Sequence, residues 1–288
     1  MLEKVKIIEC PRDAMQSIMT LIPTKTKLNY LQSVVDVGFD IVDIGSFVSS
    51  KAIPQLSDTK DIIDLIDLSN SDSKLLTIVA NKKGAENASS FEKISFIGYP
   101  FSISEGFQIR NTNKSINDSV NELDNIISIS DKANKEIVVY LSMCFGNPYG
   151  DPWNLDIVNE WVLKISKMGV NTISLSDTIG SSNPESISSI FESVFKNHNN
   201  IEFGAHLHSE PETSYNKIKS AFEAGCRRFD SVIKGYGGCP MASNQLVGNI
   251  PTEKLVSFLD IKKVSTKINL SKFEECYQLS SDFYSHYS

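Results

Sequence analysis

The chain has 288 residues, of which 41% are hydrophobic and 22% are charged, and its net charge is −7. These values are typical of a globular protein, and the negative charge argues against nucleic acid or an anionic membrane as a partner. No apolar run approaches the roughly 20 residues that a transmembrane helix needs.

The cysteines indicate a reducing compartment. There are five of them, widely spread and without a Cys-x-x-Cys pair. This usage predicts free thiols rather than a disulfide framework. Strand-like sequence begins within a few residues of Met1, which leaves no room for a targeting peptide. We therefore expect a cytoplasmic protein.

Short apolar runs rich in Val, Ile and Phe recur along the chain, with helical patterns between most of them. Most runs are apolar on both faces, as are the strands of a parallel sheet that helices cover. The predicted strands are residues 5–8, 41–44, 75–79, 94–97, 137–141, 172–175, 201–206 and 228–232.

The intervening segments have the period of amphipathic helices. Residues 24–37 place apolar side chains on one stripe, and Gly38 follows as a predicted C-cap. The next helix is predicted to open at Ser57 or Asp58. Further helices are predicted at residues 115–133, 154–168, 184–196 and 213–224.

Eight strands that alternate with helices predict an α/β fold of the (β/α)8 TIM-barrel type. The alternative is a doubly wound open sheet, but no Gly-x-Gly-x-x-Gly follows the first strand. We expect one catalytic domain over residues 1–288, with the barrel over about 4–259 and additional C-terminal helices over about 260–288.

In a TIM barrel, functional side chains come from the carboxyl ends of the strands. Each polar residue found there could instead have a structural role, such as capping a helix or forming an ion pair. Because so many of them gather at one end of the barrel, the sequence predicts an active site there. The residues are Arg12, Asp13, Gln16, Asp43, Ser46, Asn81, Lys83, Asp177, His206, His208, Cys239 and Asn249.

Four of these residues predict a metal site. His206 and His208 are two residues apart on one strand, so their side chains share a face. With the Asp13 carboxylate and the Asn249 amide oxygen they offer oxygen and nitrogen donors without a thiolate. Such a set suits Mg²⁺ or Mn²⁺ better than a structural zinc site, and the imidazoles favour Mn²⁺ slightly.

The motifs carry a family resemblance. Pro11-Arg12-Asp13-Ala14-Met15-Gln16 resembles the Pro-Arg-Asp-Gly-Leu-Gln signature of hydroxymethylglutaryl-CoA lyases, which are metal-dependent TIM barrels. Residues 46–55 resemble their Ser-Phe-Val-Ser-Pro-Lys-x-x-Pro-Gln motif. Residues 174–180, His206-x-His208, residues 237–240 and Gly248-Asn249 continue the match, which runs from about residue 5 to 259.

The resemblance implies metal-assisted cleavage of 3-hydroxy-3-methylglutaryl-CoA to acetoacetate and acetyl-CoA, in leucine degradation, by a homodimer. Carried over by position, Asp13, His206, His208 and Asn249 would bind the metal. Arg12 would stabilise the enolate, and Cys239 would transfer a proton. The other predicted catalytic residues are Asp43 and Asp177, and the predicted acyl-CoA-binding residues are Arg12, Gln16, Ser46, Asn81 and Lys83.

The chain also departs from the family pattern. Cys10 replaces a glycine, Asp43 stands where a glutamate is expected, and residues 209–212 read Ser-Glu-Pro-Glu instead of Asp-Thr-Tyr-Gly. A lysine expected soon after Gln16 is missing. Two alternatives therefore stay open: a related aldol or Claisen enzyme for another 3-hydroxyacyl-CoA, and a catalytically silent acyl-CoA-binding protein on the same fold.

Overall fold

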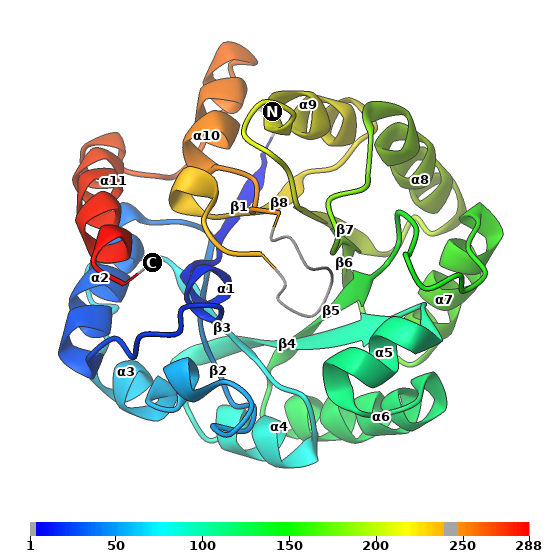
Figure 1. The fold of residues 1–288 in the computed structure, drawn as a ribbon, viewed down its shortest axis with the longest axis horizontal. Helices are drawn as coiled ribbons and strands as arrows, with labels where there is room; N and C mark the ends of the chain where they lie inside the picture. The colour runs from blue at the N-terminus through cyan, green and yellow to red at the C-terminus, as the bar shows by residue number, and fades with distance from the viewer. Residues whose placement is uncertain (1–3, 239–246, 288) are drawn as a thin grey trace.

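The computed structural model describes residues 4–238 and 247–287. Eight parallel strands close into a barrel in chain order, with the helices around it (Figure 1), so the predicted TIM barrel is confirmed. The strands are β1 Lys6–Glu9, β2 Ile41–Ser46, β3 Lys74–Ile78, β4 Ile94–Ser102, β5 Glu136–Ser142, β6 Thr172–Asp177, β7 Glu202–Leu207 and β8 Arg228–Ser231.

The helices lie between the strands in the predicted alternation. They are α1 Pro11–Met15, α2 Thr24–Val37, α3 Thr59–Leu65, α4 Lys82–Ser89, α5 Glu105–Thr112, α6 Ile116–Lys132, α7 Leu155–Lys167, α8 Pro184–Asn197, α9 Ser214–Glu223, α10 Thr252–Ile261 and α11 Leu270–Ser285. The sequence analysis did not predict the short helices α1, α4 and α5, although it did predict α3, which has seven residues.

The predicted helix ends are realised in two different ways. Gly38 ends α2 in the left-handed conformation with φ +84°, as expected for a glycine C-cap. Asp58 stands at the N-cap position of α3, but its side chain does not cap the helix. Its carboxylate instead accepts from Lys27 Nζ at 2.6 Å and from Thr24 Oγ1 at 2.7 Å, which joins α3 to α2.

Buried strands form the core. Every residue of β2, β6 and β8 is buried, in agreement with strands that are covered on both faces. Gly204 on β7 leaves room inside the barrel, because a Cβ there would lie 3.0 Å from Arg228 Cδ and 3.0 Å from Ser174 Oγ. The barrel interior therefore contains polar side chains beneath the mouth as well as apolar ones.

The C-terminal helices have separate positions. Helix α10 follows β8 in the outer ring, and α11 packs against α2 (Figure 1). Aromatic rings form this contact: Tyr30 stacks on Phe283 with 4.4 Å between ring centroids and meets Tyr284 edge-on at 5.6 Å. None of the described helices is long and apolar enough to cross a membrane.

Candidate active site

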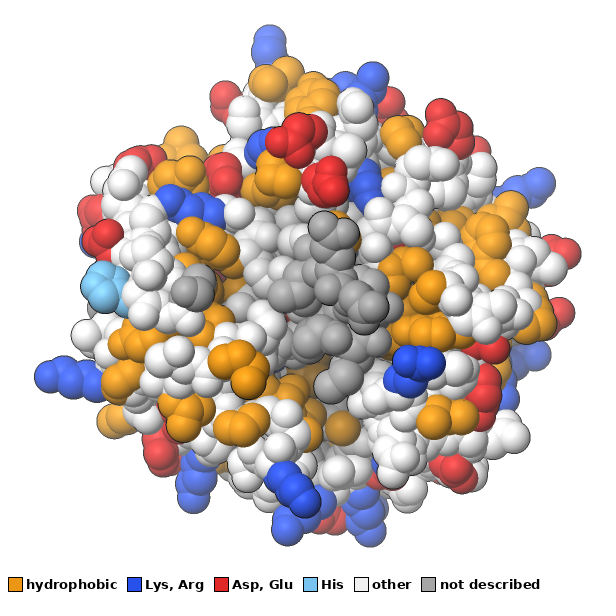
Figure 2. Space-filling model, in the orientation of Figure 1, with side chains coloured by type: hydrophobic (Ala, Val, Ile, Leu, Met, Phe, Trp, Pro, Cys, Tyr) orange, Lys and Arg blue, Asp and Glu red, His pale blue; other side chains and the backbone are white. Residues whose placement is uncertain are grey.

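A cavity of about 400 Å³ opens at the carboxyl ends of the strands. The space-filling view down the barrel shows acidic and basic side chains spread around the rim of this face (Figure 2). The cavity wall includes these predicted residues: Arg12, Asp13, Gln16, Ser46, Asn81, His206 and His208. The structure thus brings most of the predicted site to one place.

The prediction of Lys83 as a substrate-binding residue is not supported by its position. Asn81 is the N-cap of α4, and its Oδ1 accepts from Gly84 N at 2.9 Å. Two residues further along a helix, the side chain has turned by about 200°, and Lys83 is exposed and does not line the cavity. Lys114, which the sequence analysis missed, lines it instead and pairs with Glu122 at 2.5 Å.

Helix α1 and its C-cap residue Gln16 place three of the predicted side chains in one hydrogen-bonded group. Pro11 begins this helix directly after β1, so Arg12, Asp13 and Gln16 lie at the barrel mouth. Arg12 Nη1 donates to Asp13 Oδ1 at 3.0 Å and to Gln16 Oε1 at 2.9 Å. Gln16 Nε2 donates to Asp13 Oδ1 at 2.6 Å. Each member therefore restricts the other two.

Asp43 lies behind Arg12 and does not line the cavity. Its Oδ2 accepts from Arg12 Nε at 2.9 Å and from Nη2 at 2.6 Å, so one edge of the guanidinium is anchored. Burial raises the pKa of Asp43 to about 6, although the charge of Arg12 opposes this. The shorter aspartate thus still reaches the arginine, and its position is that of a residue that orients Arg12.

Asp13, His206 and His208 converge, with ligand atoms all within 4.8 Å of one another. Burial alone would raise the pKa of Asp13, but the charges of Arg12, His206 and His208 and a hydrogen bond from Asn249 lower it to about 2. Burial, and then the charge of His206, lower the pKa of His208 to about 4. The Asp13 carboxyl group is therefore ionised and the His208 imidazole is neutral, which are the states that bind a metal.

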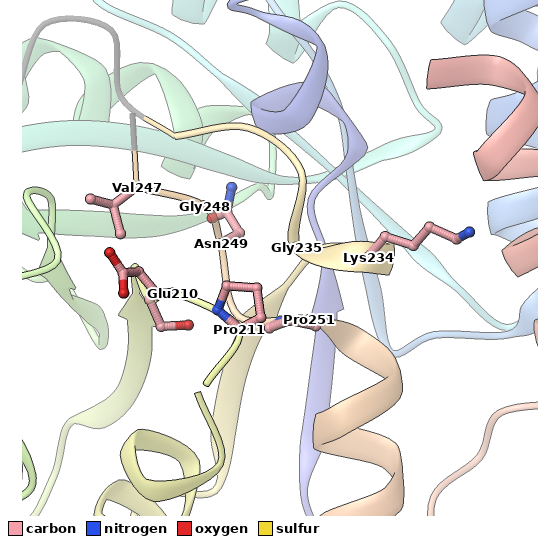
Figure 3. A pocket seen from close by; sticks show the side chains of 9 residues that line it. Glu210, Pro211, Lys234, Gly235, Val247, Gly248, Asn249 and Pro251 are labelled. Atoms are coloured by element: carbon pink, nitrogen blue, oxygen red, sulfur yellow. The ribbon is translucent and has the colours of Figure 1, made fainter. Parts of the chain in front are cut away.

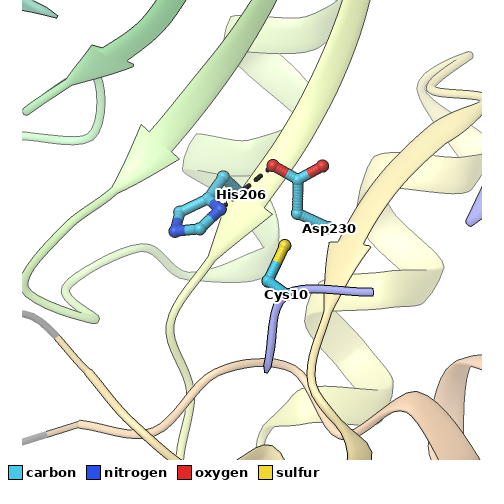
Figure 4. Close-up of side chains that lie close together, drawn as sticks. All are labelled: Cys10, His206 and Asp230. Atoms are coloured by element: carbon cyan, nitrogen blue, oxygen red, sulfur yellow. Dashed lines mark hydrogen bonds and ion pairs between the residues drawn. The ribbon is translucent and has the colours of Figure 1, made fainter. Parts of the chain in front are cut away.

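His206 is held by a residue that the sequence analysis missed. Its Nδ1 lies 3.0 Å from Oδ2 of Asp230 on β8 (Figure 4). Ser174 Oγ donates to the same oxygen at 3.1 Å. Cys10 lies beside this pair, with its Sγ within 4.8 Å of both ligand atoms. Arg228 and Asp230 lie on one face of a short buried strand. This pattern could have identified Asp230 from the sequence, because buried charges require partners.

Asn249 contacts the site through its amide nitrogen. Its Nδ2 donates to Asp13 Oδ2 at 2.8 Å and to the carbonyl oxygen of Tyr236 at 2.9 Å. The sequence predicted its amide oxygen as a metal ligand, which needs the amide group to be turned over. Asn249 thus lies beside the other predicted ligands, and its hydrogen bond to Asp13 stabilises that carboxylate.

Asp177 is buried behind the cavity wall, between Ser176 and Thr178, which line it. Its Oδ2 accepts from the backbone N of Ser182 at 3.0 Å, from Ser182 Oγ at 2.5 Å and from Lys217 Nζ at 3.0 Å. Lys217 was missed, although it lies on the inward stripe of α9 one residue before Ile218, where a lysine is unexpected.

A second cavity of about 200 Å³ lies beside Asn249. Ser209, Glu210 and Pro211, which depart from the family pattern, form part of its wall, and the side chain of Lys234 points away from it (Figure 3). The departing residues therefore lie next to the predicted metal ligands. Cys239, predicted to transfer a proton, lies outside the described residues.

A closed parallel barrel that gathers a carboxylate, two imidazoles and a guanidinium at its carboxyl end has the arrangement of a TIM-barrel enzyme. The model of the HMGL-like family matches residues 4–279. The chain belongs to this family, which confirms the resemblance seen in its motifs.

Individual relatives agree with this assignment. The chain is 30% identical to the cytoplasmic 3-hydroxy-3-methylglutaryl-CoA lyase of Rattus norvegicus over 276 residues, which cover 95% of this chain and 79% of the relative. It is 31% identical to the hydroxymethylglutaryl-CoA lyase of Bacillus subtilis over 275 residues, which cover 94% and 90%.

Solved structures show the same similarity. The HMG-CoA lyase of Bacillus subtilis superposes with a TM-score of 0.90 at 29% identity, covering 97% of this chain and 93% of that one. The HMG-CoA lyase of Acinetobacter baumannii, in complex with coenzyme A and 3-methylmalate, gives 0.89 at 27% identity, covering 97% and 91%.

Proposed function

We propose that this protein cleaves 3-hydroxy-3-methylglutaryl-CoA to acetoacetate and acetyl-CoA. The observation that carries the proposal is the convergence of Asp13, His206 and His208 within 4.8 Å, beside Arg12, at the mouth of the barrel. The similarity to hydroxymethylglutaryl-CoA lyases over 95% of the chain supports the choice of substrate.

The residues present fit a divalent metal, and we propose Mg²⁺ or Mn²⁺. Asp13, His206 and His208 would hold it, with Asn249 as a further ligand once its amide is turned. Both ring nitrogens of His208 are buried and lack a hydrogen-bond partner of ordinary geometry among the described residues, which suits a ligand role. When bound, the metal supplies Lewis-acid polarisation of the substrate hydroxyl, which lowers the pKa of that hydroxyl.

Arg12 is the group proposed to meet the charge that develops on the thioester. Cleavage moves the electron pair of the broken carbon–carbon bond onto the acetyl-CoA fragment as an enolate. Asp43 anchors one edge of the Arg12 guanidinium, so the positive charge is in place before the reaction begins. A fixed charge of this kind needs no reorganisation when the enolate forms.

Two proton transfers complete the cleavage. The tertiary hydroxyl loses a proton as it becomes the ketone of acetoacetate, and the enolate carbon gains one to give acetyl-CoA. We propose Cys239 for the acid–base role, as the resemblance implies. Asp43 and Asp177 remain predicted catalytic residues. Both are buried; Asp43 accepts from Arg12, and Asp177 accepts from Ser182 and Lys217.

The wall of the cavity suits an acyl-CoA. We propose that Gln16, Ser46 and Asn81 contact the acyl portion, because all three line the cavity. Lys114 takes the place predicted for Lys83 as a lysine on this wall. Apolar residues between these groups, such as Ile53, provide surface for the aliphatic part of the substrate.

A steady-state assay of acetoacetate release tests the proposal. We expect cleavage that depends on Mg²⁺ or Mn²⁺ and is abolished by a chelator, and the Asp13→Asn variant should be inactive under the same conditions. Cleavage of a different 3-hydroxyacyl-CoA only would support the related aldol or Claisen enzyme. Binding of acyl-CoA without any cleavage would support the silent alternative, and either result would overturn the proposal.

Cellular location and assembly are proposed separately. We propose a cytoplasmic location, because the four described cysteines, Cys10, Cys144, Cys226 and Cys276, are free and buried. We propose a homodimer on the family resemblance alone. The named relatives include both cytoplasmic and mitochondrial proteins. Sedimentation of the purified protein tests the dimer, and fractionation of cells tests the location.

A further inference from the structure

A buried lysine connects the ends of two strands behind the predicted metal site. Lys217 on α9 is 4% exposed. Its Nζ donates to the carbonyl oxygen of His208 at 2.7 Å, to Asp177 Oδ2 at 3.0 Å and to the carbonyl oxygen of Gly180 at 3.0 Å. These bonds use all three donors of an ammonium group. Lys217 therefore acts on its protein neighbours rather than on a ligand.

The three acceptors belong to different segments. Asp177 ends β6, Gly180 lies in the loop before α8, and His208 follows the last residue of β7. A buried ammonium group is stable only with a counter-charge and complete hydrogen bonding, and Asp177 provides the charge. The lysine thus ties α9 to the neighbouring ends of β6 and β7.

The two predicted histidine ligands are held in different ways. Asp230 contacts the ring of His206 directly, whereas the ring of His208 interacts with the backbone of Thr178, without a hydrogen bond of normal geometry among the described residues. The direction of the His208 ring therefore depends on how the neighbouring main chain is held. An isolated antiparallel bridge to Asn249 holds that main chain on one side, and the bond from Lys217 holds its carbonyl group.

We propose that Lys217 is a positioning residue for His208. By donating to the main-chain carbonyl of His208, with Asp177 as its counter-charge, it directs the imidazole toward Asp13 and His206. The proposal rests on the metal site of the proposed function for its consequence, but the positioning itself is a property of the metal-free protein.

The first experiment observes His208 without metal. The chain has only four histidines, so labelling histidine with ¹⁵N gives a small set of side-chain signals in the full-length protein. In the Lys217→Met variant we expect the His208 signals to shift or broaden, while those of His206 stay in place because Asp230 still holds its ring. The control Lys219→Met, which changes an exposed lysine of α9, should leave all signals unchanged.

The second experiment measures Mn²⁺ affinity by calorimetric titration. Partners that orient metal ligands typically change metal affinity by about 10- to 100-fold, so Lys217→Met should weaken Mn²⁺ binding by at least tenfold. It should also lower thermal stability, because Asp177 is left as a buried charge without its partner.

The double variant Asp177→Asn/Lys217→Met separates positioning from stability. It removes both buried charges, so its thermal stability should recover relative to the single variant, and it serves in place of the single variant if that one does not fold. The bond to the His208 carbonyl is still missing, so Mn²⁺ affinity should stay low and the His208 signals should stay altered.

Two results would overturn the proposal: unchanged His208 signals in Lys217→Met, or recovery of both the signals and the Mn²⁺ affinity in the double variant. If the signals change as expected but the wild-type protein binds no Mn²⁺, the positioning stands and the proposed function fails.

Discussion

His206 Nδ1 and Asp230 Oδ2 lie 3.0 Å apart; the carboxylate is buried, and the imidazole borders the cavity at the barrel mouth. A carboxylate at Nδ1 holds the proton on that nitrogen, which leaves Nε2 unprotonated, and Nε2 points away from Asp230 (Figure 4). The ring orientation and the tautomer that a metal requires are therefore set by a residue from the neighbouring strand.

We expect Asp230→Asn to weaken Mn²⁺ binding by about 10- to 100-fold, because an amide accepts a hydrogen bond less strongly than a carboxylate and no longer enforces one tautomer. Calorimetric titration measures the change. Asp131→Asn, an exposed change on α6, is the matched control and should bind Mn²⁺ as the wild type does. Equal affinity in the Asp230 and Asp131 variants would show that Asp230 does not orient the ligand.

Mn²⁺ affinity should fall as the pH is lowered. Burial disfavours the charged form of His206, but the hydrogen bond and charge of Asp230 outweigh this, so the pKa of His206 is raised above its usual 6.5. Below that raised pKa, His206 must lose a proton before it binds metal, which costs about tenfold in affinity per pH unit. His208 has a pKa of about 4 and adds no dependence near neutral pH.

Titrations in buffers of different ionisation enthalpy count the released protons. One proton should be released per Mn²⁺ below the pKa of His206, and the fall in affinity should begin at a lower pH in Asp230→Asn. Affinity that is constant from pH 8 to pH 5 would contradict this assignment.

Arg12→Met should lower kcat by about 100- to 1,000-fold, because the enolate loses a positive charge held in place before the reaction. Arg12→Lys keeps the charge but loses the double contact to Asp43, so it should recover only part of the rate. Steady-state kinetics of both variants, after circular dichroism has shown that they fold, provide the measurement. A kcat within threefold of wild type for Arg12→Met would exclude the proposed role.

Glu9 has no role in the proposed reaction, but it should make the stability of the protein depend on pH. Burial raises the pKa of Glu9 from 4.5 to about 8, although hydrogen bonds from Thr252 and from the backbone of Ile233 oppose the shift. The folded protein thus holds a proton that the unfolded chain releases. Its stabilising effect is complete below pH 4.5, declines as the pH rises toward 8, and is absent above.

Glu9→Gln should therefore stabilise the protein at pH 8 by about 1–3 kcal/mol and have little effect at pH 4. A neutral side chain fits the contacts, because Oε1 accepts from Ile233 N at 2.8 Å, and an amide can donate to Thr252 Oγ1, which then donates to Ser231 Oγ. Urea unfolding at both pH values gives the comparison. A variant that is less stable than wild type at pH 8 would show that Glu9 is ionised in the fold.

The barrel and the position of its site were predictable for local reasons. Short apolar runs and period-3.6 patterns depend on neighbouring residues, so all eight strands were found. Their ends agree within two residues, except that β4 continues five residues further, to Ser102. His206 and His208 could be paired because a strand alternates its faces. Closure of the barrel then brings Asp13 beside them, as the order of the strands predicts.

The partners of these residues were not predictable in the same way. Asp230 and Lys217 meet His206 and His208 only because β8 and α9 pack beside β7. Lys83 was predicted to bind substrate but is exposed to solvent, because α4 begins after its N-cap Asn81 and directs the Lys83 side chain away from the cavity. Such contacts depend on register and on the rotation of helices, which single-sequence patterns do not specify.

The amino-acid sequence by itself determined the alternation of strands and helices, the family, and the residue types at the strand ends, because these follow from local periodicity and contiguous motifs. Only the tertiary structure decided which charges are buried, which nitrogen of His206 is held, and that Lys217 supports His208. These properties arise from atoms that are distant in the chain and adjacent in the barrel, where low solvent exposure makes each buried charge depend on its partner.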